Sequence, residues 1–322
     1  MSRRLFRALI LLFAALPGCD TRALEETATA RAGVLNGEPS PAGPEDGVLA
    51  LRTEVDGAEL VCSATLVAPN LVLTARHCVS HLVPGRFSCS VKGELASADP
   101  GAGTLGTHLP ADQMEFFGLA PPRDEPLARG EFVLSTLSET ICLNDVAFVL
   151  LDRELSLPPL PLRMSGRARR GEPATIVGYG LDEDMVQQGR LDLRTQVRLH
   201  NDELTIEEVG PPSSDDLVTV VPPRTLLVTG PSGCFGDSGG PLLARDSNAV
   251  LGVYSLMAGA DCTAKTARHL FVHFPDFQAL TRDAFELAGH EPIAEADPSS
   301  AGAGGEGGAD AGAPGAGGAA GT

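Results

Sequence analysis

The sequence has no tryptophan and only two tyrosines among its 322 residues, whereas glycine (37) and proline (25) are abundant. Valine, leucine and threonine recur in short runs between turn residues, a mixture that favours many short strands over long helices. Basic residues are also scarce: the sequence has 24 Lys and Arg but 42 Asp and Glu, which gives a net charge of -18. The negative electrostatic field of such a chain repels phosphate backbones and anionic membrane surfaces. Nucleic acid is therefore excluded as an expected partner.

Residues 1–18 are predicted to be an export signal, with Arg3, Arg4 and Arg7 before an apolar stretch at 8–16 that is too short to span a bilayer. Residues 16–19, Leu-Pro-Gly-Cys, resemble the lipobox of bacterial lipoproteins. By that resemblance Cys19 is lipidated and residues 19–33 form a membrane tether or propeptide. The alternative is simple secretion after removal of the signal.

Six cysteines remain once Cys19 is set aside: Cys62, Cys78, Cys89, Cys142, Cys234 and Cys262. An even set in an exported chain indicates disulfides, although six cysteines allow fifteen pairings. Short spans favour Cys62–Cys78 and Cys234–Cys262, which leaves Cys89–Cys142. Metal binding is the competing use of cysteine, but no Cys-x-x-Cys or paired Cys/His spacing occurs. We expect no metal and no organic cofactor.

Residues 34–292 have globular character and are predicted to be all-β, as a barrel or a sandwich. The strand-like runs are 59–67, 71–74, 145–151, 174–179, 225–229, 249–256 and 269–274. One helix is predicted over 276–287 from the spacing of its apolar residues. Residues 91–130 are rich in Gly, Ala and Pro and are interpreted as a long surface insertion. Residues 293–322, mostly Gly and Ala, are predicted to be a disordered tail.

The most specific motif is residues 234–242, Cys-Phe-Gly-Asp-Ser-Gly-Gly-Pro-Leu. A serine hydroxyl is a weak nucleophile unless a base takes its proton, and the resulting oxyanion needs preset hydrogen-bond donors. Glycines permit the tight backbone that would aim the N–H groups of Gly236 and Ser238 into one hole. A Gly-rich turn without chemistry is the plain alternative.

Two further motifs supply a base and an acid. His77 follows an apolar strand and adjoins Cys78, which can fix its loop, so its imidazole is a candidate general base. Asp145 immediately precedes the apolar run 146–151 and can accept the imidazole N–H, which selects the tautomer and stabilises the imidazolium. Taken alone, each would more often be a structural or surface residue.

Together, residues 74–78, 145–149 and 236–241 resemble the motifs of the trypsin/chymotrypsin family of serine proteases, in the family's order of His, Asp and Ser. The resemblance implies two packed six-stranded antiparallel β-barrels, split near 160–170, with the active site between them. It also implies a serine endopeptidase that acts on polypeptides.

By the same resemblance the triad is His77, Asp145 and Ser238, and the oxyanion hole is formed by Gly236 and Ser238. The expected specificity pocket contains Ser232, Ser255 and Met257. A trypsin-like enzyme would carry an aspartate at position 232, so basic substrate residues are disfavoured. Met257 would make the pocket shallow and apolar, which suits small or aliphatic side chains.

The chain departs from the family pattern at two places. Arg76 stands where a small residue usually precedes the histidine, and Leu256 stands where a tryptophan commonly follows the serine. Both departures leave room for a catalytically silent, protease-like binding module. A third interpretation is an α/β-hydrolase, whose nucleophile elbow also fits Gly-x-Ser-x-Gly at 236–240, with Asp261 or Asp276 and His290 as partners.

Residues 34–37, Val-Leu-Asn-Gly, resemble the start of a mature enzyme of this family. There the freed α-amine would pair with Asp237, because a buried carboxylate needs a partner. The uncut chain would then be a zymogen, and an activating protease would cut after Gly33. The alternative is that Val34 merely begins the first strand.

Overall fold

Antiparallel strands form most of the regular secondary structure in the described residues, as the short apolar runs and their glycine and proline borders predict. The computed structural model describes residues 34–119, 125–180, 197–210, 221–228, 232–258 and 268–296. The predicted signal, Cys19, Gly33 and residues 297–322 of the predicted tail lie outside these ranges. The first residues of that tail, 293–296, are described and belong to the folded part, because Ile293 and Glu295 form backbone hydrogen bonds with Leu162. The strands form two barrels in sequence, so the predicted all-β class is confirmed.

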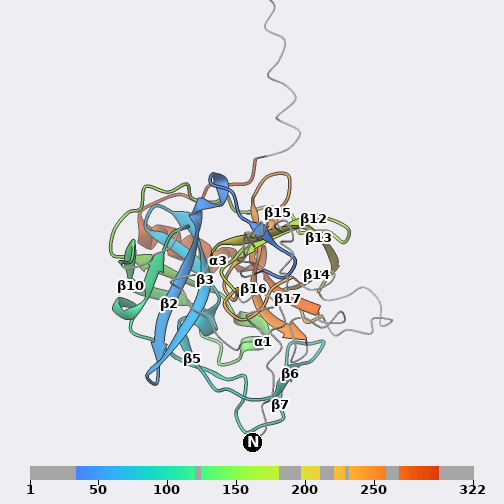
Figure 1. Ribbon diagram of the computed structural model, residues 1–322. Helices are drawn as coiled ribbons and strands as arrows, with labels where there is room; N and C mark the ends of the chain where they lie inside the picture. The colour runs from blue at the N-terminus through green and yellow to red at the C-terminus, as the bar shows by residue number, and fades with distance from the viewer. Residues whose placement is uncertain are drawn as a thin grey trace, which may run out of the picture. The chain divides into compact units, whose positions relative to one another are not determined.

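The first barrel is a closed ring of strands in the order β10-β11-β4-β3-β2-β9 (Figure 1). Their bounds are β2 (Val48–Val55), β3 (Ala58–Ala68), β4 (Leu71–Thr74), β9 (Glu115–Phe117), β10 (Ala128–Ser135) and β11 (Ala147–Leu151). Strands β4 and β11 pair with Thr74 opposite Ala147. The end of β4 therefore lies beside the start of β11. The residues just after β4 and those just before β11 are brought close together by this pairing.

The predicted surface insertion at 91–130 is partly wrong. Strand β9 and the first residues of β10 belong to the barrel, and Met114, Phe116 and Phe117 are fully buried in its core. A three-residue strand carries too little alternation to be recognised among glycines and prolines. Outside the barrel, residues 91–130 also contribute β7 (Leu95–Ser97) and β8 (Leu105–His108). These strands pair with β6 (Phe87–Cys89) and β5 (Ser80–Leu82) of the preceding segment in two small two-stranded sheets.

The second barrel has the strand order β13-β12-β15-β16-β17-β14, and a further pairing of β13 with β14 closes the ring. A short strand, β1 (Glu38–Pro39), adds to the outer edge of β13. The other bounds are β12 (Pro173–Gly178), β13 (Leu199–Val209), β14 (Thr225–Val228), β15 (Pro241–Ala244), β16 (Val250–Ala258) and β17 (Arg268–His273). The two barrels implied by the family resemblance are thus both present.

Within the described ranges the helices are short, apart from the one near the C-terminal end. These ranges contain η1 (Pro44–Gly47), η2 (Arg76–Cys78), η3 (Ala111–Gln113), α1 (Ile141–Asn144), η4 (Phe274–Phe277) and α3 (Gln278–Ala288). The predicted helix at 276–287 is α3, which starts two residues later because the tighter turn η4 precedes it. Ala284, Phe285 and Ala288 pack into the core of the first barrel, so this helix couples the chain's end to its first half. No helix in the described ranges has the length and apolarity to cross a membrane.

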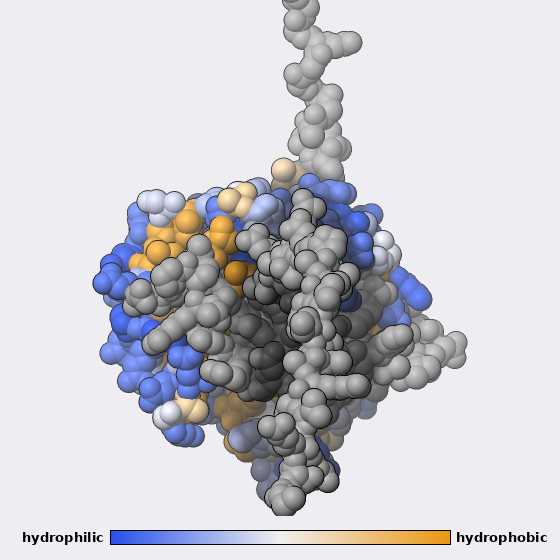
Figure 2. Space-filling view, in the orientation of Figure 1, coloured by the Kyte–Doolittle hydropathy of each residue, from blue (hydrophilic) through white to orange (hydrophobic). Residues whose placement is uncertain are grey.

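Two predicted disulfides are confirmed, Cys62–Cys78 and Cys89–Cys142. Cys234 is also disulfide-bonded, and its predicted partner Cys262 lies outside the described residues. Disulfides are typical of exported proteins. Hydrophilic side chains cover most of the coloured surface on the face shown in Figure 2, with smaller hydrophobic areas between them.

Candidate active site

The pairing of β4 with β11 places His77 beside Asp145. Strand β4 ends at Thr74 and leads into η2, which carries His77, while Asp145 lies two residues before β11 begins. The disulfide from Cys78 to Cys62 on β3 fixes η2 against the barrel. Two residues 68 positions apart in the sequence are therefore held together by a sheet register and a covalent bond.

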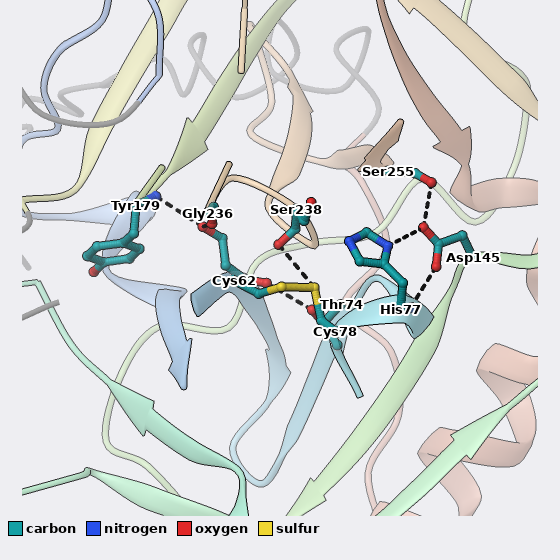
Figure 3. Close-up of a disulfide and its surroundings, with 10 residues drawn as sticks. Cys62, Thr74, His77, Cys78, Asp145, Tyr179, Gly236, Ser238 and Ser255 are labelled. Carbon is teal, nitrogen blue, oxygen red and sulfur yellow. Dashed lines mark hydrogen bonds and ion pairs between the residues drawn. A yellow bond between two sulfur atoms is a disulfide. The ribbon is translucent and has the colours of Figure 1, made fainter. Parts of the chain in front are cut away.

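The carboxylate of Asp145 is completely buried and accepts three hydrogen bonds (Figure 3). His77 Nδ1 lies 2.7 Å from Oδ2, the backbone N–H of His77 donates to Oδ1 at 2.8 Å, and Ser255 Oγ donates to Oδ2 at 2.5 Å. An ionised carboxylate only accepts hydrogen bonds, so Nδ1 must carry its proton here. The lone pair of the neutral ring is thereby left on Nε2.

Burial and charge act in opposite directions on this pair. Burial alone would raise the pKa of Asp145, but the charge of His77 and the hydrogen bonds from His77 and Ser255 hold that pKa below its ordinary value. For His77, burial lowers the pKa, while the charge of Asp145 and its hydrogen bond raise it, and the net direction is upward. The imidazolium form is therefore stabilised by Asp145.

Ser238 lies on the other side of the imidazole ring, so that the ring sits between Asp145 and Ser238 in Figure 3. The loop that carries Ser238 is tied to strand β3 of the first barrel by one residue. Ser63 donates its backbone N–H to the carbonyl oxygen of Ser238 at 2.8 Å and its hydroxyl to the carbonyl oxygen of Gly236 at 3.0 Å. The imidazole ring of His77 therefore has Asp145 on one side and the partly exposed Ser238 on the other.

The backbone around Ser238 has the conformation that the glycines predict. Gly236 has a φ of 99°, a value that side chains rarely adopt. A Cβ on Gly239 would lie 2.1 Å from Thr74 Oγ1, so only glycine allows this close approach to β4. Among the described residues, the N–H groups of Gly236 and Ser238 donate to no protein acceptor. They are free to donate to a developing oxyanion.

The three residues expected in the specificity pocket have different surroundings. Ser232 is fully buried, and its hydroxyl has no hydrogen-bond partner within the described part of the chain. Met257 is partly exposed on β16. The hydroxyl of Ser255 is committed to Asp145, a contact that the sequence analysis did not foresee. Phe235 lies three residues before Ser238 and is 60% exposed, which places a large apolar side chain near the nucleophile.

Val34 is buried and lies against Asp237. Its backbone N–H donates to Asp237 Oδ2 at 3.3 Å, and the same carboxylate accepts from the N–H groups of Gly180 (2.7 Å) and Cys234 (2.9 Å). A Cβ on Gly180 would come within 2.2 Å of Oδ2, so glycine is required there. Burial raises the pKa of Asp237 to about 7, although the N–H groups of Cys234 and Gly180 act against this rise.

Possible metal ligands gather at one place in the described ranges, where Cys62, His77 and Cys78 approach one another. Both cysteines are in the disulfide that links them, so neither sulfur is a thiolate that could bind a metal. This donor set does not fit a metal ion.

Besides the bond from Ser255 to Asp145, sequence reasoning missed the contacts that Ser63, Thr74 and Gly180 make in the site. Thr74 Oγ1 donates to the carbonyl oxygen of Ser63, and Ser63 Oγ accepts the N–H of Tyr179 at 3.0 Å. All of these residues border motifs that the sequence analysis did identify. Two of the bonds, from Ser63 to Gly236 and from Tyr179 to Ser63, join residues more than a hundred positions apart. No local sequence pattern encodes such a bond.

The raised pKa of Asp237 predicts that stability depends on pH. The folded uncut chain holds this proton up to a pH of about 7, whereas the unfolded chain releases it near pH 4. We therefore expect the free energy of unfolding to fall between pH 4 and pH 7, by at most about 4 kcal/mol. This pH dependence is measured by urea unfolding of the wild type and of Asp237→Asn at several pH values. Asp246→Asn, at an exposed aspartate, is the control. Equal pH slopes in the wild type and Asp237→Asn would contradict the assignment.

Comparison with known proteins agrees with this geometry. Bovine (Bos taurus) chymotrypsin-C is 27% identical over 214 residues, which are 62% of this chain and 69% of the relative. A trypsin from Saccharopolyspora erythraea is 25% identical over 224 residues, 69% of this chain and 86% of the relative. Among solved structures, HL collagenase has a TM-score of 0.56 at 19% identity and covers 80% of this chain and 99% of its own.

A second solved structure is an inactivated protease paralogue of the scabies mite, with a TM-score of 0.51 at 17% identity, covering 78% of this chain and 99% of its own. These two structures share the fold. The family described as trypsin-like peptidase domain matches residues 62–253, which contain the histidine, aspartate and serine motifs and most strands of both barrels. The chain belongs to the trypsin-like peptidase family.

Proposed function

We propose that the protein is a serine endopeptidase that uses His77, Asp145 and Ser238. The observation that carries this proposal is the 2.7 Å contact between His77 Nδ1 and a buried carboxylate that is itself held by two further donors. This arrangement fixes the ring, its tautomer and the direction of its Nε2 lone pair. Ser238 lies on that side of the ring (Figure 3).

The mechanism follows from these contacts. His77 Nε2 accepts the hydroxyl proton of Ser238 as Oγ attacks the carbonyl carbon of the scissile peptide bond. The imidazolium forms beside the charge of Asp145, and the N–H groups of Gly236 and Ser238 donate to the oxyanion. The proton then passes from His77 to the leaving amine, which leaves an acyl-enzyme. Water, with its proton taken by His77, hydrolyses this ester and restores Ser238.

A catalytically silent binding module is the second candidate. Arg76 and Leu256 depart from the family pattern, and one structural neighbour is an inactivated paralogue. Against the binding module, the carboxylate of Asp145 accepts all three of the hydrogen bonds from His77 and Ser255 described above. The α/β-hydrolase reading has less support, because His290 Nε2 lies 3.5 Å from Glu154 and strands do not alternate with helices in the described ranges.

A fluorophosphonate probe separates an enzyme from a silent module. We expect the mature protein to be labelled at Ser238, with labelling lost in Ser238→Ala and slowed about 10³-fold or more in His77→Ala. Ser90→Ala removes a hydroxyl from an outlying turn and is the matched control. Mass spectrometry of the labelled peptide locates the adduct. A folded mature protein that does not react would support the binding module.

The pocket residues support a preference for small or aliphatic side chains before the scissile bond. Ser232 carries no charge to pair with Arg or Lys, and Met257 is apolar. We expect a peptide library to show cleavage after Ala, Val or Leu. Ser232→Asp is expected to shift cleavage towards Arg and Lys, with Ser90→Ala again as the control. A strong wild-type preference for Arg or Lys would contradict this assignment.

We further propose that the chain is a zymogen that another protease activates by cutting after Gly33. The cut replaces the amide of Val34, which donates to Asp237 at 3.3 Å, with an ammonium group. A positive charge lowers the pKa of a neighbouring carboxyl group. The resulting ion pair would fix the loop from Cys234 to Ser238. If Cys19 is the lipid anchor, the same cut releases the enzyme from the membrane.

The activation proposal is tested with the intact chain and with a form cut after Gly33. We expect cutting to raise kcat/KM at least about a hundredfold, which corresponds to an activation free energy lower by about 2.7 kcal/mol. Membrane fractionation should find the uncut chain in the membrane fraction and the cut form in solution. Equal activity of both forms would refute the zymogen, and a cut form that stays membrane-bound would refute the release.

A further inference from the structure

A buried arginine adjoins the candidate base. Arg76 precedes His77 in η2 and is only 6% exposed, although this family position usually holds a small residue. Its Nη1 donates to the carbonyl oxygen of Ser138, and its Nη2 lies 3.5 Å from the carbonyl oxygen of Gly106. Its Nε has no hydrogen-bond partner in the described part of the chain. A charge is rarely placed in such a position unless it is paired or bonded.

The two carbonyl groups belong to segments that border the site. Ser138 lies in the connection from β10 to α1, and Asp145 follows α1 directly. Gly106 lies in β8, which pairs with β5, the strand that follows η2. The backbone N–H of Leu105 also donates to the carbonyl oxygen of Glu139, so these segments are already neighbours. The guanidinium therefore bridges the turn that carries His77 and the segment that leads into Asp145.

The charge of Asp145 acts on Arg76. Burial lowers the pKa of Arg76, while the negative charge of Asp145 raises it, so the guanidinium lies within electrostatic reach of that carboxylate. The pKa of His77 is shifted by burial, by the charge of Asp145 and by the hydrogen bond to Asp145, and Arg76 is not among these causes. Arg76 therefore affects His77 through the placement of its turn against Asp145.

We propose that Arg76 is a positioning residue for the protease: its guanidinium holds the His77 turn against the segment that carries Asp145. This inference rests on the proposed function for its catalytic consequence. Its physical content concerns only the orientation and protonation of His77, so it can be tested without catalysis.

The titratable groups that face this cluster come from three elements. Asp145 precedes β11, His77 and Arg76 belong to η2, and His108 belongs to β8. Burial and the charge of Arg76 lower the pKa of His108, whose Nε2 lies 2.8 Å from Ser135 Oγ. His108 must therefore be followed separately in any titration of His77.

The test is an NMR titration of the imidazole signals in the full chain carrying Ser238→Ala, with His77 and His108 assigned by His77→Gln and His108→Gln. The contact with Asp145 raises the pKa of His77, so a turn that is no longer held against Asp145 should lower it. We expect Arg76→Met, which removes every donor, to lower the pKa of His77 by about 0.5 to 1 unit, and Arg76→Lys, which cannot bridge both carbonyl groups, to lower it less. Arg153→Gln, at an exposed arginine, is the control for loss of one surface charge. An unchanged or raised His77 pKa in folded Arg76→Met would overturn the positioning role.

Kinetics of the mature enzyme test the catalytic consequence. Arg76→Lys cannot reproduce the fork of donors to two carbonyl groups, so we expect about a tenfold lower kcat with little change in KM. Arg76→Met should show at least the same loss, with the acid limb of kcat/KM moved to lower pH. Wild-type kinetics in Arg76→Lys would refute the positioning role. An inactive wild type would instead refute the proposed function, while the NMR titration still decides the positioning of His77.

Discussion

The nucleophile loop keeps its place because Ser63 binds it from the opposite barrel. The backbone N–H of Ser63 donates to Ser238, its hydroxyl donates to Gly236 and accepts from Tyr179, and its carbonyl oxygen accepts from Thr74. One residue of β3 thereby joins the strand that leads to the base, the loop of the nucleophile and the second barrel. Each bond is buried, so leaving any partner unpaired would cost roughly 1–3 kcal/mol. The hydrogen bonds of Ser63 therefore hold several parts of the site in place at once.

Two buried aspartates show how partners decide the behaviour of the same chemical group. Asp145 has a histidine and a hydroxyl group as partners, and its pKa lies below the ordinary value. Asp237 is equally buried, its hydrogen bonds within the described ranges come from backbone amides, and its pKa rises to about 7. Amide hydrogen bonds offset part of the desolvation, but they carry no countercharge. A free α-amine at Val34 would supply one, which is the chemical basis of the proposed activation.

The departures from the family pattern concentrate around His77 rather than at the nucleophile. Leu256 packs with the small apolar cluster that includes Ile141 and Cys142, next to Asp145 in the sequence. Arg76 lies in the turn of the base and binds two backbone carbonyl groups. The oxyanion loop, by contrast, keeps every glycine that its geometry needs. Under the proposed function, the chain retains the parts that would stabilise charge on the substrate and varies residues near the proposed base.

The sequence by itself determined the fold class, the three chemical motifs and the two disulfides that the structure describes. Local patterns suffice for most of these, because strands, glycine turns and the short span Cys62–Cys78 are encoded by nearby residues. Cys89–Cys142, 53 positions apart, was predicted only as the pair that the short spans left over. Only the tertiary structure decided the contacts made at a distance, such as the bond from Ser255 to Asp145 and the place of Phe116 in the first barrel. A hydrogen bond between residues 110 positions apart depends on the register of several strands at once, and no local pattern carries that information.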